Sequence, residues 1–215
     1  MIVKEIPFPG VDFATPQGSI SVAAMTVGTI VLGPGKRSVL WVQGCPFHCP
    51  GCIAPDWIPF RPAMSVHPIE AASYLLSDPD VTGITLSGGE PMMQALPLAH
   101  LLEAALRQRP INVVVYTGFR YEELLKHPPV VGVHRLLELI DVLIDGPYIQ
   151  RLNDNKGVRG SSNQRILRLT NKLDGFDFEG QPRSIELRVQ NGQILVIGVP
   201  DNHLLQTLDQ IIDQK

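Results

Sequence analysis

The chain has 215 residues, of which 44% are apolar, and this is enough for one sizeable hydrophobic core. Its 18 basic and 21 acidic residues give a net charge of -3, so no overall positive field attracts nucleic acid or an anionic membrane. The first residues lack the basic start and apolar run of a targeting signal, and no segment approaches the ~18 apolar residues of a membrane span. We therefore expect a cytoplasmic protein of one domain, 1–215, that binds neither nucleic acid nor membranes.

The first third of the chain predicts two strands, 19–32 and 37–44, which are rich in β-branched side chains and separated by a glycine-rich turn. After them, segments with helical spacing of apolar residues alternate with short, nearly continuous apolar segments. The predicted helices are 67–78, 93–109, 121–127 and 133–140, and the predicted strands are 83–89, 111–118 and 141–146. This alternation predicts parallel strands covered by helices, as an open sheet or a partial barrel, with ligands at the carboxyl ends of the strands.

The last third of the chain is different in composition. Residues 147–180 are polar, and a loop of this length in a compact domain is typically functional or disordered. The Asn191-Gly192 pair between alternating apolar residues predicts a β-hairpin over 184–199. A final helix, 202–214, is predicted from apolar residues on one face, which are Leu204, Leu205, Leu208, Ile211 and Ile212. We expect a core of about 33–170, followed by a hairpin-plus-helix tail over 181–215.

All three cysteines of the chain, Cys45, Cys49 and Cys52, lie within eight positions. An odd number of clustered cysteines argues against a secreted disulfide framework and favours reduced thiols in a reducing compartment. A zinc site would need a fourth ligand such as His48, which lies inside the cluster and would crowd it. A 4Fe-4S cluster uses one thiolate per iron, so three thiolates leave one iron open to a small molecule. Plain burial of small cysteines is the remaining alternative, although the intervening prolines and glycine indicate a loop in which side chains converge.

The segment CPFHCPGC, 45–52, resembles the Cys-x3-Cys-x2-Cys signature of radical S-adenosylmethionine enzymes, in which the open iron chelates the methionine part of the cosubstrate. About forty residues later, TLSGGEPM, 85–92, resembles the Gly-Gly-Glu motif of that superfamily, in which glycines let the strand backbone approach the methionyl amino group. Alone, this motif also fits an ordinary turn with Glu90 in the first turn of a helix. Together, the two motifs imply a 4Fe-4S cluster and S-adenosylmethionine as cofactors, on a partial (βα)6-type barrel.

Further stretches resemble the anaerobic ribonucleotide reductase activating proteins, small activases that install a glycyl radical on a partner enzyme. The matching stretches, in order from about Gly33 to Arg165, are GPGKRSVLWVQGC, VVVYTGFRYEELL, DVLIDGPYIQRL and RGSSNQRI. The chain departs from this family after Cys52, where an aromatic residue and Asn are common and Ile53, Ala54 and Pro55 stand here. It is also longer than the compact activases at both ends. These departures leave the partner open.

The resemblance implies roles for individual positions. The three cysteines would ligate the cluster, and Gly51 and Ile53 would lie against the adenine. The methionyl end would be held by Ser87, Gly88, Gly89 and Glu90, and the ribose or carboxylate would be reached by Thr117 and Asp145. Alternatively, Thr117 caps the following helix and Asp145 forms a turn with Gly146. A mobile segment near the open site or the partner is implied for Arg159, Ser161, Ser162, Asn163 and Arg165, although a solvated loop would have the same composition.

The expected reaction begins with an electron from a flavodoxin- or ferredoxin-type reductant, which cleaves S-adenosylmethionine to methionine and a 5′-deoxyadenosyl radical. In an activase, this radical takes a hydrogen atom from a glycine of a glycyl radical enzyme, such as anaerobic ribonucleoside-triphosphate reductase. A radical enzyme that acts on a small molecule, like the deazaguanine-forming synthases, or on a peptide bound at a strand edge is the alternative. A non-enzymatic iron-sulfur carrier is less favoured, because a carrier has no use for the Gly-Gly-Glu strand end.

Overall fold

The computed structural model describes residues 18–190, 193–201 and 204. Its main sheet has seven strands in the order β3-β1-β2-β4-β5-β6-β7. The strands are β1 (Ile20–Thr29), β2 (Arg37–Val42), β3 (Met64–Val66), β4 (Gly83–Gly88), β5 (Asn112–Thr117), β6 (Val142–Asp145) and β7 (Arg165–Arg168). The helices are α1 (Pro68–Leu75), α2 (Ala95–Gln108), α3 (Tyr121–Lys126) and α4 (Val133–Leu137).

The sheet is mostly parallel, as the sequence predicted. Strands β2, β4, β5 and β6 pair in parallel, so their carboxyl ends meet at one edge. Strands β1, β3 and β7 are antiparallel to their neighbours. The expected α/β class is thus confirmed, whereas the (βα)6-type barrel is not. The described sheet has β3 and β7 as its two edges, and its outer strands follow turns and loops instead of crossover helices.

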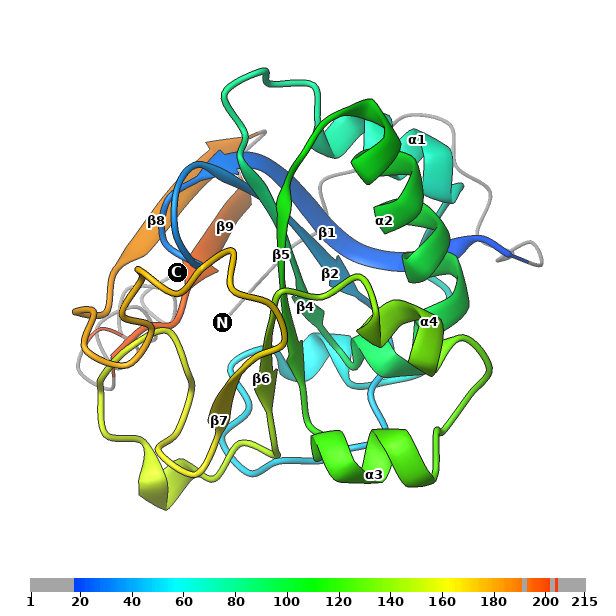
Figure 1. The fold of residues 1–215 in the computed structure, drawn as a ribbon. Helices are drawn as coiled ribbons and strands as arrows, with labels where there is room; N and C mark the ends of the chain where they lie inside the picture. Colours follow the sequence, from blue (N-terminus) through cyan, green and yellow to red (C-terminus); the bar gives the residue numbers. More distant parts are fainter. Residues whose placement is uncertain (1–17, 191–192, 202–203, 205–215) are drawn as a thin grey trace.

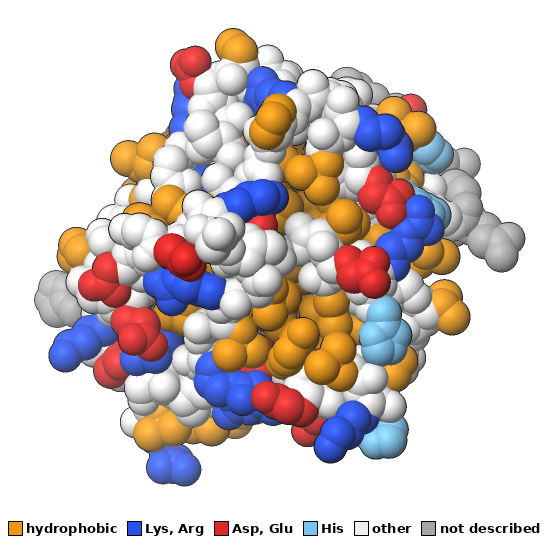
Figure 2. Space-filling model, viewed as in Figure 1, with side chains coloured by type: hydrophobic (Ala, Val, Ile, Leu, Met, Phe, Trp, Pro, Cys, Tyr) orange, Lys and Arg blue, Asp and Glu red, His pale blue; other side chains and the backbone are white. Residues whose placement is uncertain are grey.

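One face of the sheet is covered by the four α-helices (Figure 1). Strand β5 illustrates the packing, because Val113 and Val115 belong to the helix-side core and Val114 to a core on the opposite face. The helix layer leaves the β7 end of the sheet less covered, and Leu139, Leu167 and Leu169 are only partly buried against the helix-side core. Figure 2 shows apolar side chains at the surface of this view, bordered by charged ones.

The opposite face of the sheet is covered by the long 147–180 segment and by the hairpin β8–β9 (Ile185–Gln190 and Gln193–Gly198). Val158, Leu173 and Phe178 of the long segment pack against Val114 and Ile144, so this segment, which includes the unexpected strand β7, belongs to the core. The predicted hairpin is confirmed by the antiparallel pairing of β8 and β9. Its Asn191-Gly192 turn and the predicted helix over 202–214 lie outside the described residues.

The glycine-rich turn over residues 33–36, with Gly33 and Gly35, is followed by Arg37 and lies at the amino end of β2, opposite the edge where ligands are expected. Arg37 is fully buried and donates to the backbone oxygens of Pro34 and Ile84 and, at 2.8 Å, to the Oγ1 of Thr85. Burial lowers the pKa of this guanidinium to about 10. The turn therefore ties β2 to β4 and contributes to the fold, not to the site.

No helix in the described part of the chain is both long enough and apolar enough to cross a membrane.

Candidate active site

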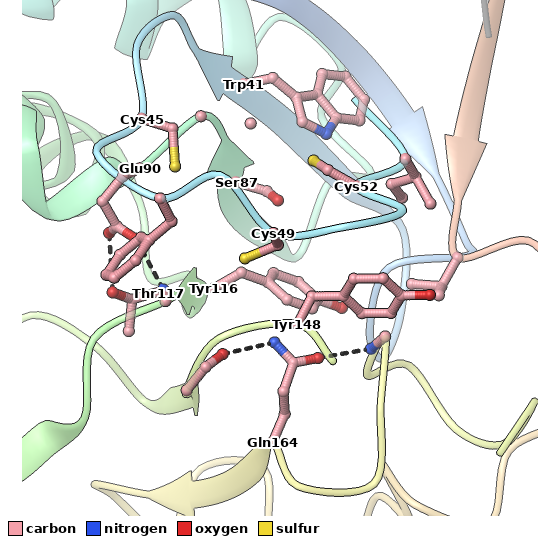
Figure 3. Close-up of a pocket in the computed structure, with 18 of the residues that line it drawn as sticks. Trp41, Cys45, Cys49, Cys52, Ser87, Glu90, Tyr116, Thr117, Tyr148 and Gln164 are labelled. Atoms are coloured by element: carbon pink, nitrogen blue, oxygen red, sulfur yellow. Dashed lines mark hydrogen bonds between the residues drawn. The ribbon is translucent and has the colours of Figure 1, made fainter. Parts of the chain in front are cut away.

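The three cysteines lie on the loop that follows β2, and backbone hydrogen bonds fix both ends of this loop. The amides of Gly44 and Cys45 donate to the carbonyl oxygens of Trp57 and Ile58, each at 2.9 Å. The side chain of Gln43 donates to the carbonyl oxygen of Pro59 at 2.7 Å. All three cysteines are free and partly buried, and their thiols surround one space in the cavity (Figure 3).

This cavity lies at the carboxyl ends of β4, β5 and β6, where the alternation of strands and helices predicted a ligand site. The cluster and cofactor residues that the resemblance implied line it, except Gly51 and Asp145. The residues implied for a segment near the site or the partner do not line it: Arg159, Ser161, Ser162, Asn163 and Arg165. Gly51 lies instead beside the side chain of Gln150. Sequence reasoning missed several lining residues, which include Trp41, Tyr116, Tyr148, Gln164, Arg183 and Pro200. The alternation of β2 and β5 could have placed Trp41 and Tyr116 on the inner face, but no local pattern indicates the others.

Glu90 is the buried carboxylate of the cavity, with 1% of its surface exposed. Its Oε1 accepts from the amide of Met92 at 2.9 Å and from the Oγ1 of Thr117 at 2.8 Å, and its Oε2 accepts from the amide of Gly118 at 2.7 Å. Burial raises the pKa of Glu90 to about 7, although the three donors favour the ionised form. Thr117 therefore supports Glu90 and, through its Oγ1, also accepts from the amide of Phe119 at 3.2 Å.

The arrangement of the thiols fits an iron-sulfur cluster better than a zinc ion. The ligands of a zinc ion lie about 2.0–2.3 Å from it. Among the described residues, no three His, Cys, Asp or Glu side chains come close enough together to bind one such ion. His48 is exposed and does not line the cavity, so the zinc alternative lacks its fourth ligand. A 4Fe-4S cluster instead spreads three thiolates over three irons.

Without a bound cation, the thiols of Cys45 and Cys52 are neutral near pH 7. Burial raises the pKa of Cys45 to about 12, and burial also raises the pKa of Cys52. Because cluster ligands are thiolates, the residues must release these protons when a cluster binds.

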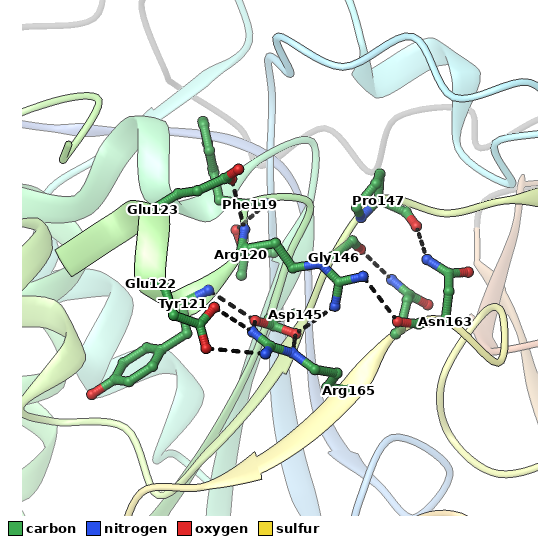
Figure 4. Close-up of polar contacts among 12 residues, drawn as sticks. Phe119, Arg120, Tyr121, Glu122, Glu123, Asp145, Gly146, Pro147, Asn163 and Arg165 are labelled. Atoms are coloured by element: carbon green, nitrogen blue, oxygen red, sulfur yellow. Dashed lines mark hydrogen bonds and ion pairs between the residues drawn. The ribbon is translucent and has the colours of Figure 1, made fainter. Parts of the chain in front are cut away.

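Asp145 lies just outside the cavity lining, in the network of Figure 4. Its buried carboxylate accepts from the amide of Tyr121 at 2.8 Å and from the Nε of Arg165 at 2.9 Å, and it also pairs with Arg120. Arg165 donates further to Glu122, at 2.8 and 3.0 Å. The structure thus gives Asp145 protein partners that join α3, β6 and β7, and the Arg165 side chain belongs to this network.

We expect Asp145→Asn to lower the free energy of unfolding by about 3 kcal/mol, because the two arginines would lose the buried charge between them. Urea unfolding of the cluster-free protein measures this change. Asp174→Asn is the matched control, since the Asp174 carboxylate is 60% exposed and lies 3.8 Å from Arg168. It is expected to change stability by less than about 0.5 kcal/mol. Equal effects of the two variants would contradict the structural role of Asp145.

Comparison with known proteins identifies the family. The model of the 4Fe-4S single cluster domain family matches residues 31–167. The anaerobic ribonucleoside-triphosphate reductase-activating protein of Escherichia coli (strain K12) is 36% identical over 149 residues, which are 64% of this chain and 91% of the relative. The protein of the same name from Enterobacteria phage T4 is 29% identical over 143 residues, 63% of this chain and 86% of the relative.

A second group of relatives has another partner in its name. The pyruvate formate-lyase-activating enzyme of Staphylococcus aureus (strain USA300) is 29% identical over 167 residues, which are 69% of this chain and 60% of the relative. These relatives and the family match confirm the predicted cofactors, a 4Fe-4S cluster and S-adenosylmethionine. The chain belongs to the 4Fe-4S single cluster domain family and is a radical S-adenosylmethionine enzyme of the activating type.

Proposed function

We propose that this protein reductively cleaves S-adenosylmethionine and uses the product radical to generate a glycyl radical on a partner enzyme. One observation carries this proposal: three free thiols and the Gly-Gly-Glu end of β4 line the same cavity. With both cofactors bound, one electron breaks the S–C5′ bond, and methionine and a 5′-deoxyadenosyl radical form. That radical becomes 5′-deoxyadenosine when it takes a hydrogen atom from the α-carbon of a glycine.

The residues of the chain would bind and orient the cofactors. Cys45, Cys49 and Cys52 would hold three irons and leave the fourth open to the methionyl end. At that end, Ser87, Gly88 and Gly89 would offer strand backbone, and ionised Glu90 would attract the ammonium group.

Ile53 would lie by its backbone against the adenine, and the resemblance assigns the same role to Gly51. The apolar side chains of Leu32, Trp41 and Ile58 also line the cavity and would keep water from the radical.

The proposed partner is a glycyl radical enzyme, since the relatives are named as activating proteins of anaerobic ribonucleoside-triphosphate reductase and of pyruvate formate-lyase. A flavodoxin- or ferredoxin-type protein is the proposed reductant. The free thiols support a reducing compartment, which we propose to be the cytoplasm.

The test is the formation of 5′-deoxyadenosine from S-adenosylmethionine by the anaerobically reconstituted protein after reduction with dithionite. We expect product from the wild type and none from Cys49→Ala, which removes one of the three thiolates. His48→Ala is the matched control, because this exposed side chain lies in the same loop but outside the cavity lining, and it should keep wild-type activity. A wild-type protein with a full cluster that forms no 5′-deoxyadenosine would refute the proposal.

The partner is then tested by electron paramagnetic resonance. Incubation of the active protein with anaerobic ribonucleoside-triphosphate reductase or with pyruvate formate-lyase should produce a stable glycyl radical signal on one of them. Steady 5′-deoxyadenosine formation with no glycyl radical on either protein would favour a small-molecule or peptide substrate instead.

A further inference from the structure

The segment from Arg183 to Pro200 lies beyond the family match, which ends at residue 167, and yet it forms one wall of the cofactor cavity. Four of its residues line the cavity: Arg183, Gly198, Val199 and Pro200. The part of the chain that the family match leaves out therefore contributes to the site.

The same segment supports the cysteine loop through apolar packing. Strand β9 and the residue after it place Leu195, Ile197 and Val199 in one core cluster with Ala54, Trp41 and Trp57. The two tryptophan rings are 5.8 Å apart, and Trp57 accepts the backbone hydrogen bond that begins the cysteine loop. Ala54 comes two residues after the last cysteine.

Arg183 connects this wall to residues 159–160 of the long segment. Its Nη1 donates to the carbonyl oxygen of Pro200 at 3.1 Å, and its Nη2 donates to those of Arg159 and Gly160 at 2.8 and 3.1 Å. The three bonds hold together two stretches of backbone that no strand pairing joins among the described residues.

The connection continues to the end of β6. The amide of Gly160 donates to the Oε1 of Gln164 at 2.8 Å, and the Nε2 of Gln164 donates to the carbonyl oxygen of Gly146 at 2.9 Å (Figure 3). Gly146, Gly160, Gln164 and Arg183 all line the cavity. The guanidinium of Arg183 and the amide of Gln164 thus connect the backbone of Pro200, residues 159–160 and Gly146 beside the cavity.

The hairpin has a separate anchor at a distance from the cavity lining. Arg188 donates to the carbonyl oxygens of Val27 and Gly28, at 2.7 and 3.0 Å, and to Thr26. This residue does not line the cavity. Attachment of the hairpin to the sheet therefore does not depend on Arg183 alone, and the contacts of Arg183 serve the cavity rim.

We propose that Arg183 is a positioning residue for S-adenosylmethionine. Its guanidinium holds the 159–164 loop and Pro200 in the arrangement that closes the cavity around the cosubstrate. This inference rests on the proposed function for the identity of the cosubstrate. Loss of Arg183 frees both stretches of backbone and lowers affinity, while the thiols and Glu90 keep their own contacts.

The test compares Arg183→Ala and Arg183→Lys with the wild type, all with reconstituted clusters. Calorimetric titration with S-adenosylmethionine before reduction measures affinity without turnover. We expect about tenfold weaker binding for Arg183→Ala, as the loss of one to two net hydrogen bonds implies. KM for 5′-deoxyadenosine formation should rise by a similar factor, with kcat changed less than about twofold. Arg183→Lys keeps the charge but lacks the fork that reaches three carbonyls, so it should restore affinity only in part.

Arg109→Ala is the matched control, because the Arg109 guanidinium also binds two carbonyl oxygens, those of Asp78 and Pro79, and lies outside the cavity lining. It should leave affinity and iron content unchanged. Wild-type affinity in Arg183→Ala with a full cluster would overturn the proposal, as would equal losses in Arg183→Ala and Arg109→Ala.

If Arg183→Ala does not retain iron, Arg183→Lys carries the test, and wild-type affinity in that variant overturns the proposal. An experiment in which the proposed function fails would give a different result from one in which the role of Arg183 fails. A wild-type protein that binds S-adenosylmethionine but forms no 5′-deoxyadenosine would refute the reaction and leave the affinity comparison valid.

Discussion

Gly89→Ala is expected to lower the free energy of unfolding by about 3 kcal/mol and to abolish binding of S-adenosylmethionine. A methyl group on Gly89 would lie 2.7 Å from the carbonyl carbon of Gly44 and 2.9 Å from the carbonyl oxygen of Trp57, and closer still to the carbonyl oxygen of Gly44. These are backbone atoms, which cannot rotate away as the end of a side chain can. The strand end and the cysteine loop would have to separate.

The same two segments are joined by backbone hydrogen bonds that such a separation would break. The amide of Gly89 donates to the carbonyl oxygen of Val42 at 2.7 Å, and the amide of Glu90 donates to that of Gly44 at 2.9 Å. The contact thus couples the Gly-Gly-Glu strand end to the start of the cysteine loop. A change at Gly89 should therefore also lower the iron content of the reconstituted protein.

Urea unfolding, iron content and calorimetric titration with S-adenosylmethionine measure these effects. Gly175→Ala is the matched control, because a methyl group there would meet no atom within 4 Å. We expect that control to change the free energy of unfolding by less than about 0.5 kcal/mol and to keep wild-type binding. A stable Gly89→Ala protein with normal iron content would contradict the described packing of β4 against the loop.

Most elements of the fold could be predicted from local patterns. The four parallel strands carry continuous apolar residues and alternate with segments of helical spacing, and these signals are local in the sequence. Strand β3 has only three residues, and β7 lies inside a polar segment, so neither produces a pattern. Whether the sheet closes into a barrel could not be decided from local patterns, because closure depends on the pairing of the outer strands, and in the described sheet β3 and β7 remain its two edges.

The site divides in the same way. The three cysteines lie within one short stretch of sequence, and the Gly-Gly-Glu motif lies within another, so each motif by itself indicates the chemistry. Arg183 binds carbonyl oxygens of residues 17 to 24 positions away, and any residue type could supply those oxygens. The partners of Asp145 likewise depend on the antiparallel return of β7, which brings Arg165 opposite Asp145. Contacts between distant segments decide which polar residues face the cavity, and these contacts cannot be predicted from local sequence patterns.

Glu90→Gln is expected to weaken binding of S-adenosylmethionine and to change how stability depends on pH. The carboxylate accepts three hydrogen bonds from Met92, Thr117 and Gly118, and the NH2 group that replaces one of its oxygens in glutamine cannot accept. One donor would be left unpaired in a buried site, at a cost of about 1–3 kcal/mol. The proposed attraction between the carboxylate and the ammonium of the cosubstrate would also be lost.

The pH dependence follows from the raised pKa of Glu90, which burial moves from 4.5 to about 7. A carboxyl group whose pKa is higher in the folded protein stabilises the fold while it is protonated, and this stabilisation is lost as the pH rises toward 7. The free energy of unfolding of the cluster-free wild type should therefore fall by about 3 kcal/mol relative to Glu90→Gln between pH 5 and pH 8. Affinity for S-adenosylmethionine should rise over the same interval in the wild type, because only the ionised carboxylate attracts an ammonium group.

Urea unfolding and calorimetric titration at pH 5, 6, 7 and 8 measure both trends. Glu103→Gln is the matched control, because Arg135 holds the pKa of Glu103 below its usual value and this group is already ionised at pH 5. The free energy of unfolding of Glu103→Gln should change with pH in parallel with that of the wild type. If the free energy of unfolding and the affinity both change with pH in parallel for the wild type and Glu90→Gln, Glu90 is ionised throughout this interval. The three hydrogen bonds that lower its pKa would then outweigh the burial that raises it.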